Sequence, residues 1–388
     1  MDDENRAPAV NEVPIERTGT GRSRKGPGSA GKRRVLSVSL IVLLAAAAVL
    51  IFVLALFRDY PGTGGVAGDF SFEPHTSNVY AAFKGGLVVV SAADATVYGP
   101  DGRQIRREHF AADSPAISAG ENAVAAYDIG GASLIVFDED ELLFSYRSDR
   151  QLIDASVNER SWVAVCETSG EYKGVVTVFD ESGRSLYKWY SAQGYVLAAS
   201  ISPNGKYLAV VTLQQKQEVF RSVVSVFALS SEDVRAEYQL EDDVIIDIGF
   251  IKNDLIACVS ESSLVYLDAE AREKAVYDYD GFSLHNYIIG PDYTVLSLSR
   301  TNSGLNGRIV TVDLSGREMG SADVSGTVQC ISSGGGRIAA LIDNSTVLYT
   351  SSMKEDGELS SSGAKKVLLT DDGSVLILTN TDAKLYLP

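Results

Sequence analysis

Short segments of alternating apolar and polar residues, separated by turns rich in Asp, Gly and Ser, recur along the chain from Asp69 onward. Alternation with a period of two residues is typical of β-strands that bury one face. The clearest segment covers residues 178–189, with the sequence VFDESGRSLYKW, in which a strand, an Asp/Gly turn and a second strand follow one another. The pattern therefore predicts an all-β domain built from hairpins.

The hairpins recur at a spacing that can be measured from the apolar residue near the end of each third strand. The mean spacing is (386 − 98)/7, or about 41 residues, which lies in the range of β-propeller blades. Because a four-stranded blade cannot bury its own faces, it stacks on its neighbours around a ring. We therefore expect a β-propeller of eight four-stranded blades, with seven as the alternative if one weak unit is irregular. The eight positions are Tyr98, Phe137, Phe179, Phe227, Leu267, Val312, Tyr349 and Tyr386.

The last unit supplies only three predicted strands, at residues 366–370, 375–379 and 384–387. Residues 69–73 precede the first complete unit and alternate as a strand does. We expect them to pair with the last unit as its fourth strand, because closing the ring removes sheet edges that would invite aggregation.

An apolar segment of 23 residues, 35–57, precedes the predicted propeller, and its only polar members are Ser37 and Ser39. At about 1.5 Å per residue, a helix of this length spans roughly 34 Å and crosses a bilayer once. Residues 1–34 have the composition of a disordered tail and are basic in their second half. A basic tail stays in the cytoplasm, so the C-terminal part is predicted to lie outside the membrane.

The chain is thus predicted to have four parts. They are a cytoplasmic tail (1–34), a transmembrane helix that acts as an uncleaved signal anchor (35–57), a flexible Gly-rich linker (58–68) and an extracytoplasmic propeller (69–388). A cleaved signal peptide is the alternative to the anchor, but no small-x-small cleavage site follows the apolar segment. The predicted location is the plasma membrane, with a single pass and the N-terminus in the cytoplasm.

Composition narrows the classes of partner and of chemistry. A hydrophobic content of 45% excludes a mostly disordered protein. The net charge of −17 disfavours nucleic acid, since binding phosphates requires clustered Lys and Arg. The three cysteines, Cys166, Cys258 and Cys330, have no C-x-x-C spacing and fall in units that are not neighbours in the ring. They are therefore predicted to be free thiols rather than zinc ligands or disulfide partners.

Two of the turns resemble those of known propellers. Residues 201–209, ISPNGKYLA, resemble the S-P-D-G-K-x-L-A turn of WD-repeat-like propellers, and residues 179–189 resemble the D-x-x-(T/S)-G-x-x-L-x-x-W repeat of quinoprotein-dehydrogenase-like propellers. The whole arrangement is similar to uncharacterised single-pass propeller proteins of Gram-positive-type bacteria, which implies no known biochemistry. Unlike the quinoprotein enzymes, the chain has no adjacent Cys pair to stack on a quinone, and only the third unit has the Trp. No cofactor is therefore expected.

The sequence contains no specific catalytic or metal-binding motif. The histidines, His75, His109 and His285, have no metal-ligand spacing, and no G-x-S-x-G elbow occurs. Residues 138–141 and 241–243 are acidic but do not fit a calcium-loop pattern, so they are interpreted as solvated turns. No catalytic, cofactor-binding or metal-binding residue is predicted, and an enzymatic role is disfavoured.

Long connections between second and third strands are the more informative feature. They cover residues 167–174, 214–221 and 300–308, in units three, four and six. Connections of this type emerge on one face of a propeller, so we expect a binding rim there; simple drift in loop length is the alternative. The candidate rim residues are Tyr172, Lys173, Gln215, Lys216, Phe220, Arg221, Asn302, Asn306 and Arg308.

These features predict a non-catalytic binding or scaffolding module of the cell envelope, anchored by one membrane span. The expected partner is a protein or a cell-wall polymer outside the membrane. One alternative is an envelope enzyme, either a quinoprotein-like oxidoreductase or a hydrolase, because propeller active sites can be assembled from scattered residues near the central channel. The other alternative is a transmembrane sensor of an extracellular ligand.

Overall fold

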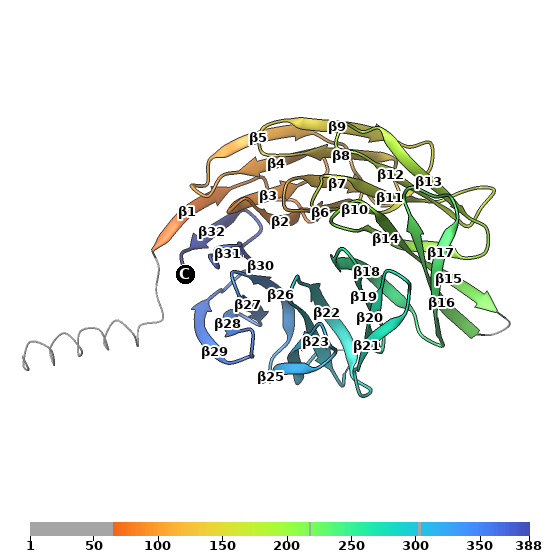
Figure 1. The fold of residues 1–388 in the computed structure, drawn as a ribbon. Helices are drawn as coiled ribbons and strands as arrows, with labels where there is room; N and C mark the ends of the chain where they lie inside the picture. The colour runs from red at the N-terminus through yellow and green to blue at the C-terminus, as the bar shows by residue number, and fades with distance from the viewer. Residues whose placement is uncertain (1–64, 217–218, 302–303) are drawn as a thin grey trace, which may run out of the picture. The chain divides into compact units, whose positions relative to one another are not determined.

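A computed structural model describes residues 65–388 apart from 217–218 and 302–303. It contains 32 strands, grouped in eight four-stranded sheets that follow one another clockwise around a ring in Figure 1. The prediction of an eight-bladed β-propeller is confirmed, and the seven-bladed alternative is wrong. The predicted tail, transmembrane helix and most of the linker, residues 1–64, lie outside the described residues. Within the part of the chain that the structure describes, no helix is long and apolar enough to cross a membrane.

Each blade contributes its strands in chain order from the channel outward, and the bounds in the first four blades are as follows. Blade 1 has β2 (Val79–Phe83), β3 (Gly86–Val90), β4 (Asp94–Tyr98) and β5 (Gln104–His109); blade 2 has β6 (Pro115–Ala119), β7 (Val124–Asp128), β8 (Ser133–Phe137) and β9 (Leu142–Arg147); blade 3 has β10 (Leu152–Val157), β11 (Val163–Glu167), β12 (Gly174–Phe179) and β13 (Ser185–Ser191); blade 4 has β14 (Tyr195–Ile201), β15 (Tyr207–Lys216), β16 (Val219–Ala228) and β17 (Val234–Glu241).

The remaining blades follow the same order except at the end of the ring. Blade 5 has β18 (Ile245–Lys252), β19 (Leu255–Ser260), β20 (Ser263–Asp268) and β21 (Glu273–Asp278); blade 6 has β22 (Ser283–Ile289), β23 (Tyr293–Ser299), β24 (Gly307–Asp313) and β25 (Glu318–Val324); blade 7 has β26 (Val328–Gly334), β27 (Arg337–Ile342), β28 (Ser345–Thr350) and β29 (Glu355–Ser360); blade 8 has β30 (Lys366–Leu369), β31 (Val375–Leu378), β32 (Asp382–Tyr386) and β1 (Val66–Ser71).

The N-terminal strand closes the ring as its sequence predicts. β1 pairs antiparallel with β32, Phe70 lying opposite Ala383 and Ser71 opposite Asp382. The strand begins at Val66, so it also includes Val66–Gly68, which sequence reasoning placed in the linker. The Phe70 side chain is fully buried between blades 8 and 1, where it packs edge-on against Tyr98 with ring centroids 6.2 Å apart.

The propeller has two faces, which differ in the connections they carry. Connections between second and third strands, and those between successive blades, lie on one face, here called the upper face; the other hairpin turns lie on the lower face. Val66 pairs with Tyr386 at the lower end of blade 8, whereas Ser71 lies at the upper end. The described chain therefore starts at the lower face.

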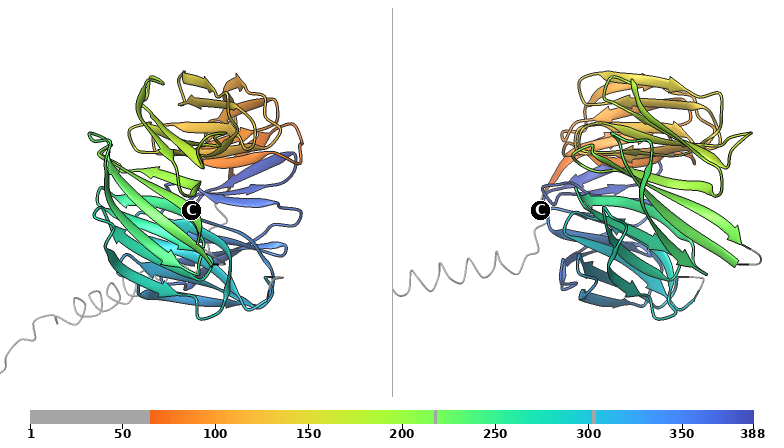
Figure 2. Two further views of the ribbon diagram at one scale, coloured as in Figure 1. Left: turned by 90° about the vertical axis from the view of Figure 1, so that its right-hand side faces the viewer. Right: turned by 45° about the vertical axis from the view of Figure 1, so that its right-hand side comes forward.

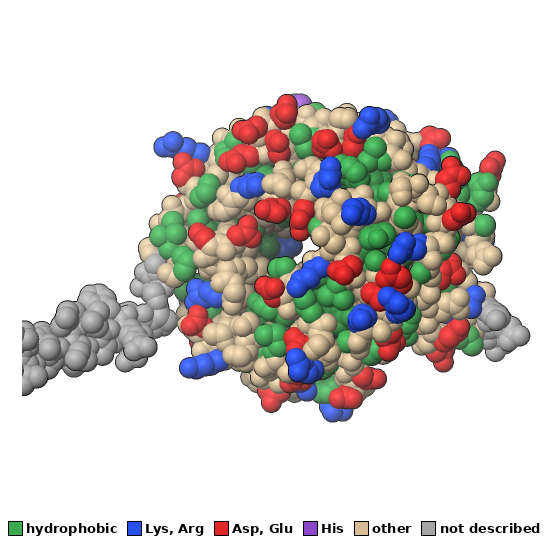
Figure 3. All heavy atoms as spheres, in the orientation of Figure 1, with side chains coloured by type: hydrophobic (Ala, Val, Ile, Leu, Met, Phe, Trp, Pro, Cys, Tyr) green, Lys and Arg blue, Asp and Glu red, His purple; other side chains and the backbone are tan. Residues whose placement is uncertain are grey.

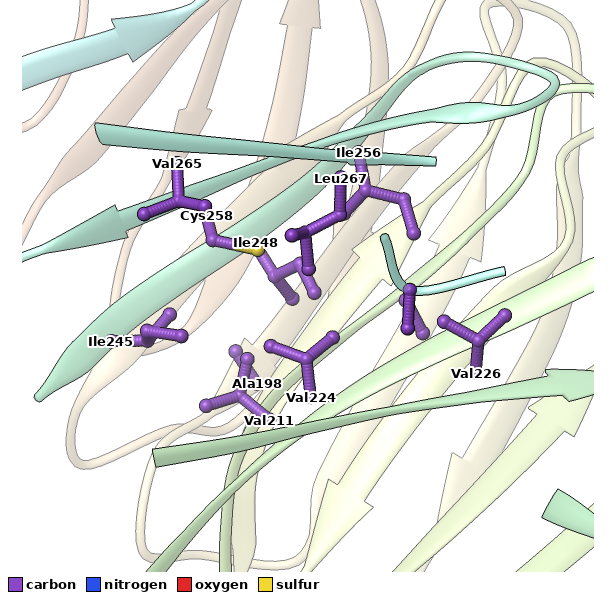
Figure 4. Packing of buried hydrophobic residues seen from close by; sticks show 12 residues of the cluster. Ala198, Val211, Val224, Val226, Ile245, Ile248, Ile256, Cys258, Val265 and Leu267 are labelled. Atoms are coloured by element: carbon purple, nitrogen blue, oxygen red, sulfur yellow. The ribbon is translucent and has the colours of Figure 1, made fainter. Parts of the chain in front are cut away.

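Hydrophobic side chains between neighbouring blades form the core. The two middle strands of a blade are buried on both sides, as in β3, whereas outer strands such as β17 alternate between exposed and partly buried residues. Figure 4 shows the cluster between blades 4 and 5, to which the inner three strands of both blades contribute. Each fully buried Val, Leu or Ile contributes about 1.5–3 kcal/mol to stability. The members of this cluster that Figure 4 labels are Ala198, Val211, Val224, Val226, Ile245, Ile248, Ile256, Cys258, Val265 and Leu267.

The Asp/Gly turn of the sequence repeat is a lower-face turn between third and fourth strands. In blades 3, 5 and 6, one carboxylate oxygen of Asp180, Asp268 and Asp313 accepts a hydrogen bond from the backbone N–H four residues later, at 2.9, 2.9 and 3.0 Å. The Arg at that later position donates its Nε to the other oxygen, at 2.9, 2.9 and 3.1 Å. Gly183 and Gly316 provide the positive φ, 77° and 76°, that the turn requires. The repeat is therefore a structural device of the lower face.

The three cysteines are free thiols, as predicted from their positions. Cys166 and Cys258 are fully buried, and Cys330 is half-buried. Burial raises the pKa of all three thiols. Thiols of this kind are poor nucleophiles and act as small apolar side chains in the core.

Candidate functional site

The long connection of blade 3 lies on the upper face and is fixed by its backbone. Residues 168–173 join β11 to β12. The N–H of Thr168 donates to the Gln151 carbonyl at 2.9 Å, and the N–H of Lys173 donates to the Ser191 carbonyl at 2.7 Å. Both ends of the connection are therefore tied to neighbouring segments of the same face.

This connection brings two predicted rim residues against tyrosines from other strands. Tyr172 packs on Tyr190 of β13, with ring centroids 5.0 Å apart. The Lys173 ammonium lies 4.7 Å from the ring centroid of Tyr195 in β14 and donates to its hydroxyl at 3.2 Å. The three tyrosines remain 42%, 41% and 60% exposed. Tyr172, Tyr190 and Tyr195 with Lys173 form a surface that we call the tyrosine cluster.

In blade 4 the structure corrects the expectation of a loop at residues 214–221. β15 and β16 continue as a paired hairpin, with Gln215 opposite Phe220 and Lys216 opposite Val219. Figure 2 shows these strands reaching beyond their neighbours. Gln and Lys are poor strand formers by themselves, but ten residues of each strand pair continuously and overrule this preference.

The rim residues of this hairpin divide into a structural and an exposed part. Arg221 donates from Nε and Nη2 to the Gln214 side chain at 3.3 and 2.9 Å, and from Nη1 to the Gln239 side chain at 3.0 Å. It thereby links all three outer strands of the blade. Val219 and Phe220 are 41% and 49% exposed, so the hairpin presents apolar surface near its upper end.

The rim residues of blade 6 lie apart from the tyrosine cluster. Arg308 donates from Nη2 to Glu318 at 2.6 Å and stacks over the ring of Phe282, 5.8 Å from its centroid. Asn306 lies before β24 with a positive φ of 52°. Asn302 falls outside the described residues. Blade 5 separates these residues from blade 4. Among the described residues, the three connections therefore form two separate surfaces and not the single rim that was expected.

A polar groove adjoins the tyrosine cluster on the side of blade 2. It has a volume of about 470 Å³ and is lined by Gly130, Arg150 and Ser169, with their neighbours in the three connections around it. The fully buried Glu167 fixes the lining residue Ser148, whose hydroxyl donates to its carboxylate at 2.6 Å. The same carboxylate accepts a hydrogen bond from the Tyr146 hydroxyl at 2.8 Å. Groove and cluster share the 168–173 connection and form one continuous candidate surface across blades 2 to 4.

The central channel is visible as a hollow in the middle of the ring in Figure 3. Its mouth on the upper face differs in character from the tyrosine cluster. The first strand of every blade from 3 to 7 carries a bulge near its upper end, where the pairing register shifts. A bulge re-aims the residues beside it. The residues that follow the five bulges are Asp154, Ala198, Asp247, Asn286 and Cys330.

The two carboxylates at this level are paired with tyrosines from neighbouring blades. Tyr127 donates to Asp154 at 3.0 Å, and Tyr287 donates to Asp247 at 3.0 Å. Burial, reinforced by repulsion from Asp247, raises the pKa of Asp154 to about 6, and burial also raises the pKa of Asp247. From blade 8, Lys366 donates to the Tyr80 carbonyl at 3.4 Å, and burial lowers the pKa of its amine.

Sequence reasoning missed Tyr190, Tyr195 and the channel carboxylates. Both tyrosines lie on strands, outside the long connections between second and third strands. The carboxylates did leave a signal, because Leu152-Ile153-Asp154 and Ile245-Ile246-Asp247 repeat the same apolar-Ile-Asp sequence at the start of two inner strands. Within residues 65–216, 219–301 and 304–388, no group of three or more His, Cys, Asp or Glu side chains is placed to hold a metal ion.

Comparison with known proteins identifies a family and a fold. The model of the family described as "Family of unknown function (DUF5711)" matches residues 66–384. No curated protein matches the chain. The crystal structure of BamB from Moraxella catarrhalis is similar with a TM-score of 0.53 at 9% identity, covering 84% of this chain and 99% of that one. The C-terminal WD40 domain of Sif2 is similar with a TM-score of 0.56 at 10% identity, covering 84% of this chain and 97% of that one. At such identities the likeness is one of fold.

Proposed function

Because the chain belongs to DUF5711, a family of unknown function, we propose its role from geometry: a membrane-anchored, extracytoplasmic propeller that binds a protein partner through the upper face of blades 2 to 4. The observation that carries the proposal is the tyrosine cluster. Three half-exposed tyrosines from separate elements meet at the 168–173 connection, Tyr172 and Tyr190 in contact with each other and Tyr195 with Lys173, next to a polar groove. The proposed role is that of a binding or scaffolding module without catalysis of its own.

The tyrosine cluster has the properties of a protein-binding surface. Tyrosine is enriched in interfaces because its rigid ring covers a large area while its hydroxyl can still form hydrogen bonds. Here the rings are held before any partner arrives, Tyr172 by Tyr190 and Tyr195 by Lys173. A surface that is already ordered loses less conformational entropy on binding. The exposed Phe220 at the end of the blade 4 hairpin extends the same side of the face.

The position of the N-terminal strand supports an anchored arrangement. The first strand, β1, starts at Val66 on the lower face, opposite the tyrosine cluster. The basic tail and the apolar segment 35–57 precede it in the sequence. The chain thus enters the propeller at the face opposite the tyrosine cluster, and this supports a partner-binding role for the upper face.

Site-specific photo-crosslinking in intact cells tests the partner. A photoreactive amino acid replaces Tyr195 in the full-length protein, and the control replaces Val234, which is 43% exposed at the lower end of β17. We expect a discrete protein adduct from position 195 and none from position 234. The adduct is identified by mass spectrometry, and the purified partner must bind the unmodified protein and lose affinity for a Tyr172→Ala/Tyr195→Ala variant. Capture of a wall polymer, or equal capture at both positions, would refute the proposal.

Membrane topology is tested separately. A reporter enzyme that is active only outside the cytoplasm is fused after Pro388. We expect it to be active and to remain in the membrane fraction until detergent is added. An inactive reporter would refute the extracytoplasmic location, and release of an active reporter without detergent would refute the anchor.

A further inference from the structure

A second concave site lies at the junction between the first and last blades, away from the tyrosine cluster. It is a cleft of about 580 Å³ beside blade 1, bordered by the segment that crosses from β1 to β2. Of the strands of blade 8, only β1 contributes a lining residue, Ser71 at its end. Its volume falls within the range of small-molecule sites, about 300–1,000 Å³.

The floor of the cleft is apolar and rigid. Phe72, Val89 and Ala92 line it, and the Phe72 ring packs on Tyr80 with centroids 5.5 Å apart. Tyr98 donates its hydroxyl to the Ser71 carbonyl at 3.3 Å, which ties the crossing segment to blade 1. The cleft is therefore shaped before a ligand enters, as small-molecule sites usually are.

Charged groups of both signs surround this floor. Asp94, whose side chain is 13% exposed, accepts from Arg107 Nη2 at 2.6 Å and from the Thr96 hydroxyl at 3.2 Å. The Arg107 side chain is 48% exposed, and among the described residues its hydrogen bond to Asp94 uses only Nη2. The remaining guanidinium N–H groups can hold a carboxylate.

One carboxylate on the crossing segment, that of Glu73, is suited to a cation. Glu73 lines the cleft and forms no ion pair among the described residues. The Asn78 side chain also lines the cleft and donates from Nδ2 to the Glu73 carbonyl at 2.9 Å. Its own Oδ1 is buried without a hydrogen-bond partner. Because this oxygen has almost no surface open to the cleft, Asn78 holds the crossing segment in place and does not itself receive a ligand.

The charges decide which ligand fits. Glu73 and Asp94 contribute two negative charges and Arg107 one positive charge. The excess negative charge repels a simple anion. A simple cation would leave the free N–H groups of Arg107 without an acceptor. A molecule with both signs satisfies both sides. We propose that the cleft binds a small zwitterion of the α-amino-acid type, with its carboxylate on Arg107 and its ammonium toward Glu73.

Titration of the full-length protein in detergent tests the proposal, by calorimetry and by the shift of the unfolding temperature. The probes are the standard free L-amino acids, dialanine, acetate and methylammonium. We expect saturable binding of at least one free amino acid and none of acetate or methylammonium at the same concentration. Dialanine carries the same terminal charges on a peptide and therefore distinguishes a site for free amino acids from a site for peptide ends. Binding of dialanine without binding of any free amino acid would identify a peptide site and overturn the proposal.

Two variants and one control locate the binding. Arg107→Met and Glu73→Gln should each weaken binding by about tenfold or more, because each removes a charge-assisted contact. Arg103→Met is the matched control, an exposed Arg of the same blade on the lower face. Glu73→Gln breaks no ion pair and should fold normally. It therefore still tests the binding site if Arg107→Met, which loses the pair with Asp94, fails to fold. Absence of binding by every amino acid, equal binding of acetate, or binding unchanged in Glu73→Gln would overturn the proposal.

Discussion

The lower and upper faces of the propeller are built from the same hairpins but use them differently. On the lower face, Asp180, Asp268 and Asp313 repeat one set of turn hydrogen bonds in three blades. On the upper face, the corresponding connections differ from blade to blade, from a tied loop in blade 3 to an extended hairpin in blade 4. The motif most visible in the sequence thus maintains the ring, and exposed aromatic residues gather where no motif repeats.

Removing a lower-face carboxylate should have the largest effect on stability. Asp180 is 3% exposed and accepts hydrogen bonds from two backbone N–H groups and from the side chains of Ser182 and Arg184. Asp180→Ala leaves these donors without their acceptor, and we expect a loss of about 2–3 kcal/mol in the free energy of unfolding. Urea unfolding followed by circular dichroism measures it.

The matched control for this prediction is the turn of blade 1. Asp101, 58% exposed in its side chain, accepts one backbone hydrogen bond from Arg103. Asp101→Ala should cost about 0.5 kcal/mol or less. Equal losses in the two variants would contradict the view that the buried carboxylate of the repeated turn stabilises the lower face.

Removing the charge of a channel carboxylate on the upper side should instead increase the free energy of unfolding. Burial and repulsion from Asp247 raise the pKa of Asp154 from 3.8 to about 6, so folding favours the protonated form. The wild-type protein therefore loses stability as the pH rises from about 4 through 6. Asp154→Asn keeps an acceptor for Tyr127 without the charge, and it should gain about 1–2 kcal/mol above pH 6 and nothing below pH 4.

Urea unfolding at several pH values measures this difference, and Asp247→Asn provides the coupled control. Without the charge at position 247, the pKa of Asp154 should fall, as followed by NMR of the carboxyl carbon. Parallel stability curves for wild type and Asp154→Asn across this pH range would show that the charge of Asp154 is not a cost to the fold.

The sequence was sufficient to predict the ring because each requirement of a blade leaves a local trace. Strand alternation, the Asp/Gly turns and the three-stranded last unit together gave eight blades and the closure by β1. The candidate site was harder to predict because it depends on register. Tyr190 and Tyr195 meet Tyr172 and Lys173 only when β13 and β14 are placed beside the blade 3 connection.

The loop expected at 214–221 fails for a related physical reason. Its Gln and Lys residues have low intrinsic strand propensity. Pairing of β15 with β16 gives each residue a cross-strand neighbour, and this pairing determines the extended conformation. A segment whose conformation is set by its partner strand cannot be assigned from its own composition. Loop length inferred from repeat spacing therefore overstates the number of flexible connections on the upper face.

The acid range offers a weaker test of the lower face. The Ser315 hydroxyl, with other donors in the turn, lowers the pKa of Asp313 to about 2. A carboxylate with a lowered pKa stabilises the fold above its ordinary pKa of 3.8, and this contribution is lost as the pH falls through about 2. The side chain is 25% exposed, so we expect Asp313→Asn to lose about 1 kcal/mol at pH 7 and little at pH 2.

Unfolding of both proteins between pH 7 and pH 2 measures the Asp313 contribution, and Ser315→Ala is its control. Removing the hydroxyl deletes the largest cause of the lowered pKa, so this variant should reproduce part of the loss at pH 7. A deficit in Asp313→Asn that stays constant down to pH 2 would mean that the turn depends on shape rather than on charge.

The smallest effect on stability is expected where the effect on function is largest. Tyr195 is 60% exposed, and its contacts with Lys173 are on the surface, so Tyr195→Ala should change the free energy of unfolding by about 0.5 kcal/mol or less. The same variant should lose the partner captured on the upper face, because truncation of a central interface tyrosine costs about 2 kcal/mol or more of binding energy. Asp180→Ala, kept at a temperature where it stays folded, should bind that partner as the wild type does. If binding instead follows stability in both variants, the two faces are not separate in function, and the tyrosine cluster is simply another part of the scaffold.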